Sequence, residues 1–137
     1  MNRLIAMLQR HEGLRLKPYK CTSGKVSIGY GRNLEDVGIS EIEAMVMLRN
    51  DIEQCYSELD VFSWFADLDQ VRQEALVDML YNLGLPTFLE FKKTLKHVAE
   101  HNWSMAAAEM LDSKWAKQVG GRAEELAYMI ETGTYLK

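Results

Sequence analysis

Proline, cysteine and long hydrophobic runs are all scarce in this chain. Among its 137 residues there are 2 prolines and 2 cysteines, and no apolar run approaches the roughly 18 residues that span a bilayer. The first thirteen residues do not read as a signal peptide, because Gln9, Arg10 and His11 interrupt their apolar stretch. We therefore expect a protein that is made and kept in the cytoplasm, without membrane insertion.

The cysteines and histidines do not form a metal-binding pattern. Cys21 and Cys55 have neither a CxxC spacing nor a metal-ligand spacing. They leave room for one disulfide, but two reduced thiols are the more common state in a cytoplasmic protein, and we expect that state. His97 and His101 lie four apart on a predicted helix, a spacing that can bind a metal. No third ligand is visible nearby, so we expect no metal and no cofactor.

A basic excess is also lacking, since the formal net charge is -4. A protein that grips nucleic acid without regard to sequence needs a basic patch, and none is evident, so we expect no nucleic-acid partner. The composition, with 47% hydrophobic and 26% charged residues, is that of a folded globular chain. Its length suits one domain.

The N-terminal part of the chain predicts a helix followed by a small β-hairpin. Asn2 is a candidate N-cap for the first helix, and Gly13 should stop it. The turn signal at 22–24 separates two short extended runs, and Val26, Ile28 and Tyr30 alternate as strand residues do. The stretch 32–38 is predicted to be a loop.

The rest of the chain predicts only helices. Ser40 and Glu43 form a capping box for a helix that runs to about Leu59, and Asp69 caps another that Gly84 ends. Met105, Ala108, Leu111 and Trp115 are predicted to face inward, and the methionines are expected to fill the core. The remaining predicted helices run over 86–98, 103–117 and 122–132.

Glu12 occupies an unusual place at the end of the first predicted helix. A carboxylate there faces the negative end of the helix dipole and is disfavoured as an anion. Nothing structural explains an acidic residue at this point, whereas a general acid benefits from such an environment. A solvated helix-end glutamate is the plainer alternative, so this position alone does not decide the function.

The hairpin brings two further polar side chains into consideration. Cys21 lies nine residues after Glu12, at the turn, and Ser27 lies six residues further on, in the second strand. A short hairpin that folds back from the helix end can place all three in one cleft. The stretch reads EGLRLKPYKCTSGKVSIGYG.

This stretch resembles the catalytic hairpin of the phage-type lysozymes, glycoside hydrolase family 24. The family motif is Glu, eight residues, Asp or Cys, five residues, Thr, and the spacing here is kept. The resemblance covers most of the chain, with similar residues at Asp51, Asn82, Gly84, Phe91, Trp103, Trp115, Arg122 and the terminal TGTY. It implies a lysozyme-like α+β fold that is mostly helical: a small lobe over 1–39 with the hairpin, a linking helix over 40–60 and a helical lobe over 61–137. The first helix is then expected to pack back against the helical lobe.

The resemblance also implies the chemistry. Glu12 is expected to protonate the leaving glycosidic oxygen, while Cys21 and Ser27 position the attacking water on the opposite face of the sugar. Two groups that flank the bond with room for water between them are typical of an inverting hydrolase. Two departures stand out: Ser27 replaces the usual Thr, and Cys21 replaces the commoner Asp.

Further residues take supporting roles by the same resemblance. Arg122 is expected to pair with Glu12, and Arg32 with Asp51, as salt bridges of the cleft. The positions at or beside the family's sugar contacts are Asn33, Tyr81, Asn82 and Thr94.

The expected substrate is peptidoglycan, cut at the β-1,4 bond between N-acetylmuramic acid and N-acetylglucosamine. The family context is host lysis by a monomeric endolysin, which waits in the host cytoplasm until a holin releases it to the cell wall. Two alternatives stay open. One is a lytic transglycosylase that uses Glu12 alone, and the other is a non-catalytic lysozyme-fold module that binds peptidoglycan or protein.

Overall fold

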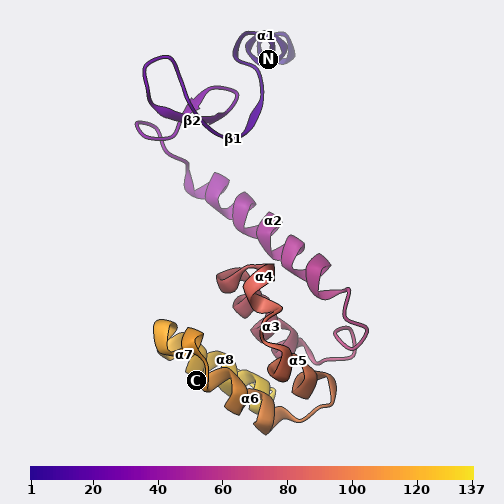
Figure 1. The fold of residues 1–137 in the computed structure, drawn as a ribbon. Coiled ribbons are helices and arrows are strands. Elements are labelled where there is room, and N and C mark those ends of the chain that lie inside the picture. The colour runs from indigo at the N-terminus through magenta and orange to yellow at the C-terminus, as the bar shows by residue number, and fades with distance from the viewer. The chain divides into compact units, whose positions relative to one another are not determined.

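The computed structural model describes residues 1–137 and divides into two compact units, residues 1–47 and residues 48–137. The prediction of a mostly helical α+β fold is confirmed: eight helices accompany one small antiparallel sheet (Figure 1). No helix is both long and apolar enough to cross a membrane. The two units are described separately below.

The small unit begins with helix α1, Asn2–Glu12. The predicted N-cap is wrong by one position, because Met1 occupies the cap and Asn2 is already helical, and no side chain caps the first turn. The predicted stop at Gly13 is confirmed. This glycine has φ 72, and its backbone N–H donates to the carbonyl of Gln9, so a residue without a Cβ suits the position. Glu12 is therefore the last residue of the helix.

The predicted hairpin is present and has a third strand. Strands β1, Arg15–Lys20, and β2, Val26–Gly29 (Figure 1), pair antiparallel. Strand β3, Arg32–Asn33, pairs with the other edge of β2. The register of β1 shifts between Arg15 and Tyr19, the part of the strand that holds Pro18. The prediction of a loop over 32–38 missed β3, because two paired residues are too few to produce a sequence pattern.

Helix α2, Glu41–Leu59, starts at the predicted capping box. The Ser40 hydroxyl accepts from the Glu43 backbone N–H at 3.1 Å, and the Glu43 carboxylate accepts from the Ser40 N–H at 2.8 Å. Two of the N–H groups that the first turn leaves unpaired are thus satisfied. This confirms the predicted start of the helix.

The helical unit continues α2 with six further helices around one hydrophobic core. Helix α8 packs against both α3 and α6, and α6 also packs against α5. The largest fully buried side chains are Leu59, Phe65, Leu76, Met79, Leu80, Phe88, Val98, Met110 and Ile130. The helices are α3, Gln70–Leu83; α4, Leu85–Phe88; α5, Lys92–Ala99; α6, Trp103–Leu111; α7, Lys114–Val119; and α8, Gly121–Thr132.

Some of the predicted helix ends in this unit are confirmed and others are wrong. The Asp69 cap, the Gly84 stop and the left-handed Gly133 after α8 are confirmed. The single helix predicted over 86–98 is wrong, because α4 and α5 are separate. The single helix predicted over 103–117 is also wrong, because the Ser113 hydroxyl accepts from the Ala116 backbone N–H and starts α7 as a new helix.

The break at Ser113 also changes which side of α6 is buried. Met105 and Leu111, predicted to face inward, are about half exposed, whereas Ala106, Ala107 and Met110 are buried. Only Trp115 of the predicted inward set is buried. Methionine fills the core at Met79, Met110 and Met129, but Met45, Met47 and Met105 are exposed, so the expectation for the methionines was only partly correct.

Candidate functional site

The hairpin brings Cys21 and Ser27 together. Cys21 closes the turn after β1: its backbone N–H donates to the Lys25 carbonyl at 2.9 Å, and its carbonyl accepts from the Gly24 N–H at 2.8 Å. Ser27 lies on β2, the central strand, where it pairs with Tyr19 on one side and Asn33 on the other. The two predicted residues thus share one small sheet.

The Cys21 thiol lies in a polar environment. Its sulfur is 3.0 Å from the Ser23 hydroxyl oxygen. This hydrogen bond is the largest of the contacts that lower the pKa of Cys21 from 9.0 to about 7, followed by bonds to the backbone at Ser23 and Lys25 and a smaller one to the Ser27 hydroxyl. Hydrogen bonds to the charged form favour it, so the thiolate is well populated at neutral pH. A thiolate accepts hydrogen bonds. The carboxylate of Asp, which the resemblance gives as the commoner residue at the Cys21 position, does the same.

Ser27 is almost fully buried, with 2% of its surface exposed. Its hydroxyl donates to the Lys25 carbonyl at 3.4 Å, which is long for a hydroxyl hydrogen bond. The oxygen keeps its acceptor capacity for another partner, such as the thiol of Cys21 or a water molecule.

Glu12 lies against the segment that follows β2. A Cβ built at Gly31, which has φ 76, would lie 2.6 Å from Glu12 Oε2, so the carboxylate occupies the space that a side chain there would take. A hollow of about 330 Å³ beside the carboxylate is lined by Ile5, Leu8, Gln9, Glu12, Tyr30 and Gly31. The acid is therefore exposed, and its side chain rests on the same sheet segment that leads from Ser27 to β3.

Arg32 pairs with Glu43 within the small unit. Its guanidinium makes a two-pronged ion pair with Glu43, at 2.8 Å to Oε1 and 2.6 Å to Oε2, and it also donates to the Gly38 carbonyl. The predicted pairing of Arg32 with Asp51 joins the two units and stays a prediction. The Arg32–Glu43 pair explains why the pKa of Glu43 falls from 4.5 to about 2, with the Arg32 hydrogen bond as the largest cause, and why the pKa of Arg32 is raised.

Asn33 is held by its own loop. Its Nδ2 donates to the Asp36 carboxylate and its Oδ1 accepts from the Asp36 backbone N–H, both at 3.0 Å. Both ends of the amide are thus engaged within the protein, which leaves less capacity for a sugar than the sequence suggested.

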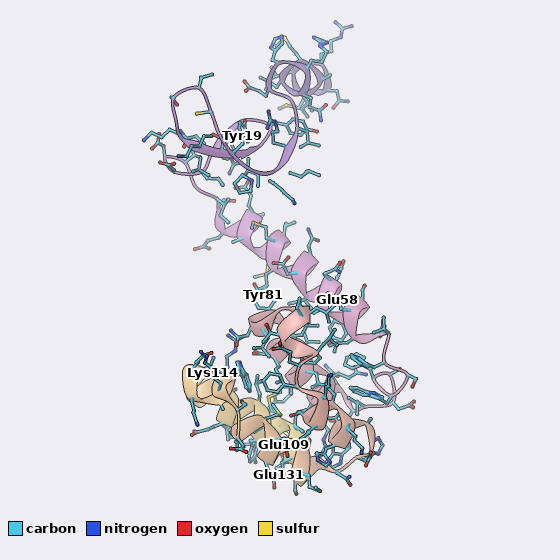
Figure 2. All side chains as sticks on the ribbon, viewed as in Figure 1. Tyr19, Glu58, Tyr81, Glu109, Lys114 and Glu131 are labelled. Carbon is cyan, nitrogen blue, oxygen red and sulfur yellow. The ribbon has the colours of Figure 1, made fainter.

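The other predicted sugar-contact residues belong to the helical unit. Tyr81 lies near the end of α3 (Figure 2) and is 46% exposed. Its neighbour Asn82 accepts a 2.7 Å hydrogen bond from the Trp115 indole N–H. That bond orients the amide so that its NH2 group remains available as a donor. Thr94 on α5 is only 2% exposed and lines a hollow beside the start of that helix.

Arg122, at the start of α8, pairs with Asp78 on α3, with Nε 2.8 Å from the carboxylate. The predicted pairing of Arg122 with Glu12 joins the two units and stays a prediction. Arg122 and Asp78 also line a hollow of about 600 Å³ in the helical unit.

The cysteines and histidines do not join any group of side chains that could hold a metal ion. Cys21 and Cys55 are free thiols. The prediction that His97 and His101 share a helix is wrong, because α5 ends at Ala99 and His101 has φ 59. His101 instead stacks on Trp103, with ring centroids 4.8 Å apart.

Sequence reasoning missed the residues that hold the predicted ones in place. The sequence marks Ser23 only as part of a turn signal, whereas its hydroxyl lies 3.0 Å from the Cys21 thiol. Glu43 was recognised as a cap but not as the partner of Arg32. Gly31 is the one such residue that the sequence signals. It follows Gly29 by two positions at the end of a strand, and a glycine there suggests that another group approaches the backbone closely.

Comparison with known proteins gives a consistent result across nearly the whole chain. A family model described as phage lysozyme matches residues 9–128. An endolysin of Acyrthosiphon pisum secondary endosymbiont phage 1 is 33% identical, over 93% of this chain and 87% of that protein. A probable T4-type lysozyme 1 of Dictyostelium discoideum is 28% identical over 93% of both chains. The pre-baseplate central spike protein Gp5 of Enterobacteria phage T4 is also 28% identical, over 95% of this chain but 28% of its own length.

Proposed function

Because this chain belongs to the phage lysozyme family and is a lysozyme-type peptidoglycan hydrolase, we propose that it cuts the β-1,4 bond between N-acetylmuramic acid and N-acetylglucosamine. Glu12 acts as the general acid and gives its proton to the leaving glycosidic oxygen. Its position supports this role, since the carboxylate is exposed at a helix end beside an open hollow. A proton donor must reach the leaving oxygen directly.

Cys21 and Ser27 hold the attacking water. The observation that carries this assignment is the thiol of Cys21, which lies within hydrogen-bonding distance of the Ser23 hydroxyl and has a pKa of about 7. At neutral pH such a group accepts a proton from water, while the Ser27 hydroxyl orients the same water. Attack by water from the face opposite Glu12 inverts the configuration at the anomeric carbon.

The proposed biological setting is the one that the family resemblance suggests. The enzyme acts late in phage infection, as a monomer that a holin releases from the host cytoplasm to the cell wall. The phage relative named endolysin supports this setting.

A clearing assay tests the proposed function. Gram-negative cells stripped of their outer membrane are mixed with wild type, with Glu12→Gln, or with Glu53→Gln, which changes an exposed glutamate of α2 in the same way. Wild type and Glu53→Gln should clear the suspension, and Glu12→Gln should not. Clearing by Glu12→Gln at the wild-type rate would overturn the role of Glu12, and no clearing by wild type would favour the non-catalytic module.

The products distinguish hydrolysis from transglycosylation. Mass spectrometry of released muropeptides should show reducing ends formed with water. An anhydro sugar at the cut end would instead identify a lytic transglycosylase that uses Glu12 alone.

A further inference from the structure

One side-chain hydrogen bond joins helix α1 to the sheet of the small unit. The Gln9 side-chain amide donates to the Tyr30 hydroxyl at 3.0 Å, across 21 residues of sequence. Gln9 lies three residues before Glu12, so the two side chains share one face of the last turns of α1. Tyr30 directly precedes Gly31, where the Glu12 carboxylate fills the space that a side chain would occupy. The bond and the close contact therefore connect the same helix face to the same two-residue segment.

The contact at Gly31 depends on the absence of a side chain. A Cβ there would lie 2.6 Å from Glu12 Oε2 and 3.2 Å from Cδ, well inside van der Waals contact. The atoms in the way belong to the flexible end of a side chain rather than to backbone. A larger residue at this position therefore moves the carboxylate and leaves the fold in place.

We propose that Gln9, Tyr30 and Gly31 are positioning residues that fix the Glu12 carboxylate relative to the strand bearing Ser27. This inference rests on the proposed function and assigns a role to residues outside the catalytic trio. No residue of α1 is buried, so within the small unit packing alone does not fix the rotation of this helix. The Gln9–Tyr30 bond supplies the missing constraint, and the Gly31 backbone limits where the carboxylate lies.

The chemistry requires such a constraint. A general acid works only within hydrogen-bonding reach of the leaving oxygen, and a displacement of about 1 Å costs on the order of 100-fold in rate. Ser27, held by its pairing with both neighbouring strands, is fixed on the sheet. Glu12 belongs to a helix, and within the small unit the connection of that helix to the sheet keeps the distance between acid and water constant.

Gly29 provides a matched control for Gly31. The two glycines have φ of 70 and 76, so an alanine at either meets the same backbone strain. A Cβ at Gly29 meets nothing within 4 Å, whereas a Cβ at Gly31 meets Glu12. Gly29→Ala and Gly31→Ala should lower the melting temperature alike. On soluble glycan strands, Gly31→Ala should lower kcat by about 100-fold with KM little changed, and Gly29→Ala should lower it by no more than about threefold.

The hydrogen bond is tested by a second set of variants. Tyr30→Phe and Gln9→Met should each lower kcat by about threefold to tenfold, and the double variant should lose no more than either single one. Tyr128→Phe, which removes an exposed tyrosine hydroxyl in the helical unit, serves as control and should leave kcat unchanged. In a Glu12→Gln background, Tyr30→Phe should have no effect on the residual rate, because the group that it positions is gone.

The outcomes separate this inference from the proposed function. Equal kcat values for Gly31→Ala and Gly29→Ala, or additive losses for the Gln9 and Tyr30 variants, would overturn the positioning roles while wild type still cuts peptidoglycan. A wild type that releases no products would overturn the proposed function itself.

Discussion

The guanidinium of Arg72 lies over the indole ring of Trp103, with its central carbon 3.9 Å from the ring centroid. The same side chain donates to the carbonyls of Ile130 and Glu131 at 2.6 and 3.0 Å. Those carbonyls belong to the last turn of α8 and have no partner within the helix. Arg72 therefore joins the start of α3, the start of α6 and the end of α8.

Arg72→Met should destabilise the helical unit. The replacement keeps part of the apolar stem but removes the cation from the ring and the donors from the α8 carbonyls, a loss of about 2 kcal/mol. Urea unfolding followed by circular dichroism measures it. Arg49→Met, at an exposed position of α2, is the control and should change the free energy of unfolding by less than about 0.5 kcal/mol. Equal effects of the two variants would contradict the role given to Arg72.

Glu43 should make the small unit sensitive to acid. The pKa of Glu43 is lowered to about 2 by Arg32 and by the Ser40 cap, so its contribution is complete above pH 4.5, the ordinary value. That contribution is lost as the pH falls from 4.5 through 2. In Glu43→Gln the free energy of unfolding of the small unit should fall less between pH 4.5 and pH 2 than it does in wild type. Urea midpoints at several pH values in low salt measure the difference, and parallel curves for the two proteins would refute it.

Ser23→Ala should make the Cys21 thiol less acidic. The Ser23 hydroxyl is the largest cause of the lowered pKa of Cys21, so its removal should move that pKa upward from about 7. The rate of alkylation by iodoacetamide as a function of pH reports the thiolate directly. Ser57→Ala, on α2, should leave the profile unchanged. A Ser23→Ala profile that overlays wild type would show that the hydroxyl does not stabilise the thiolate.

Cys21→Asp should retain activity, whereas Cys21→Ala should lose most of it. An aspartate accepts the same hydrogen bonds from water and is charged at neutral pH, while alanine does neither. Rates on purified peptidoglycan compare the two variants. NMR of the freshly released reducing end should show the α-anomer. A β-anomer, or a sugar adduct on Cys21, would instead identify the thiol as a nucleophile, and full activity in Cys21→Ala would mean that Ser27 holds the water alone.

Local signals in the sequence located most helix ends and the hairpin. The Ser40–Glu43 box, the Asp69 cap and the stop at Gly13 depend on residues a few positions apart, so the chain itself displays them. Ser113 failed as a signal because it lies between two stretches that both favour helix. The two-residue strand β3 depends on pairing with β2, which no local pattern records.

The site residues likewise fall into those that a local motif identifies and those that only tertiary contacts bring together. Glu12, Cys21 and Ser27 came from a motif, and the structure places the last two on one hairpin. The partners of these residues came from tertiary contacts that the motif does not contain. Arg32 reaches Glu43 because β3 passes the start of α2, and the amide of Asn33 is engaged by Asp36 because the loop turns back on itself.

The distribution of indole rings lets tryptophan fluorescence follow the helical unit alone. Trp64, Trp103 and Trp115 all belong to the helical unit, 48–137, and the small unit contains no tryptophan. Excitation at the red edge of the absorption band therefore produces emission from the helical unit alone. Backbone ellipticity reports both units. If the small unit melts first under denaturant, the ellipticity begins to fall while the emission maximum stays constant; if the two units melt as one, the curves superimpose.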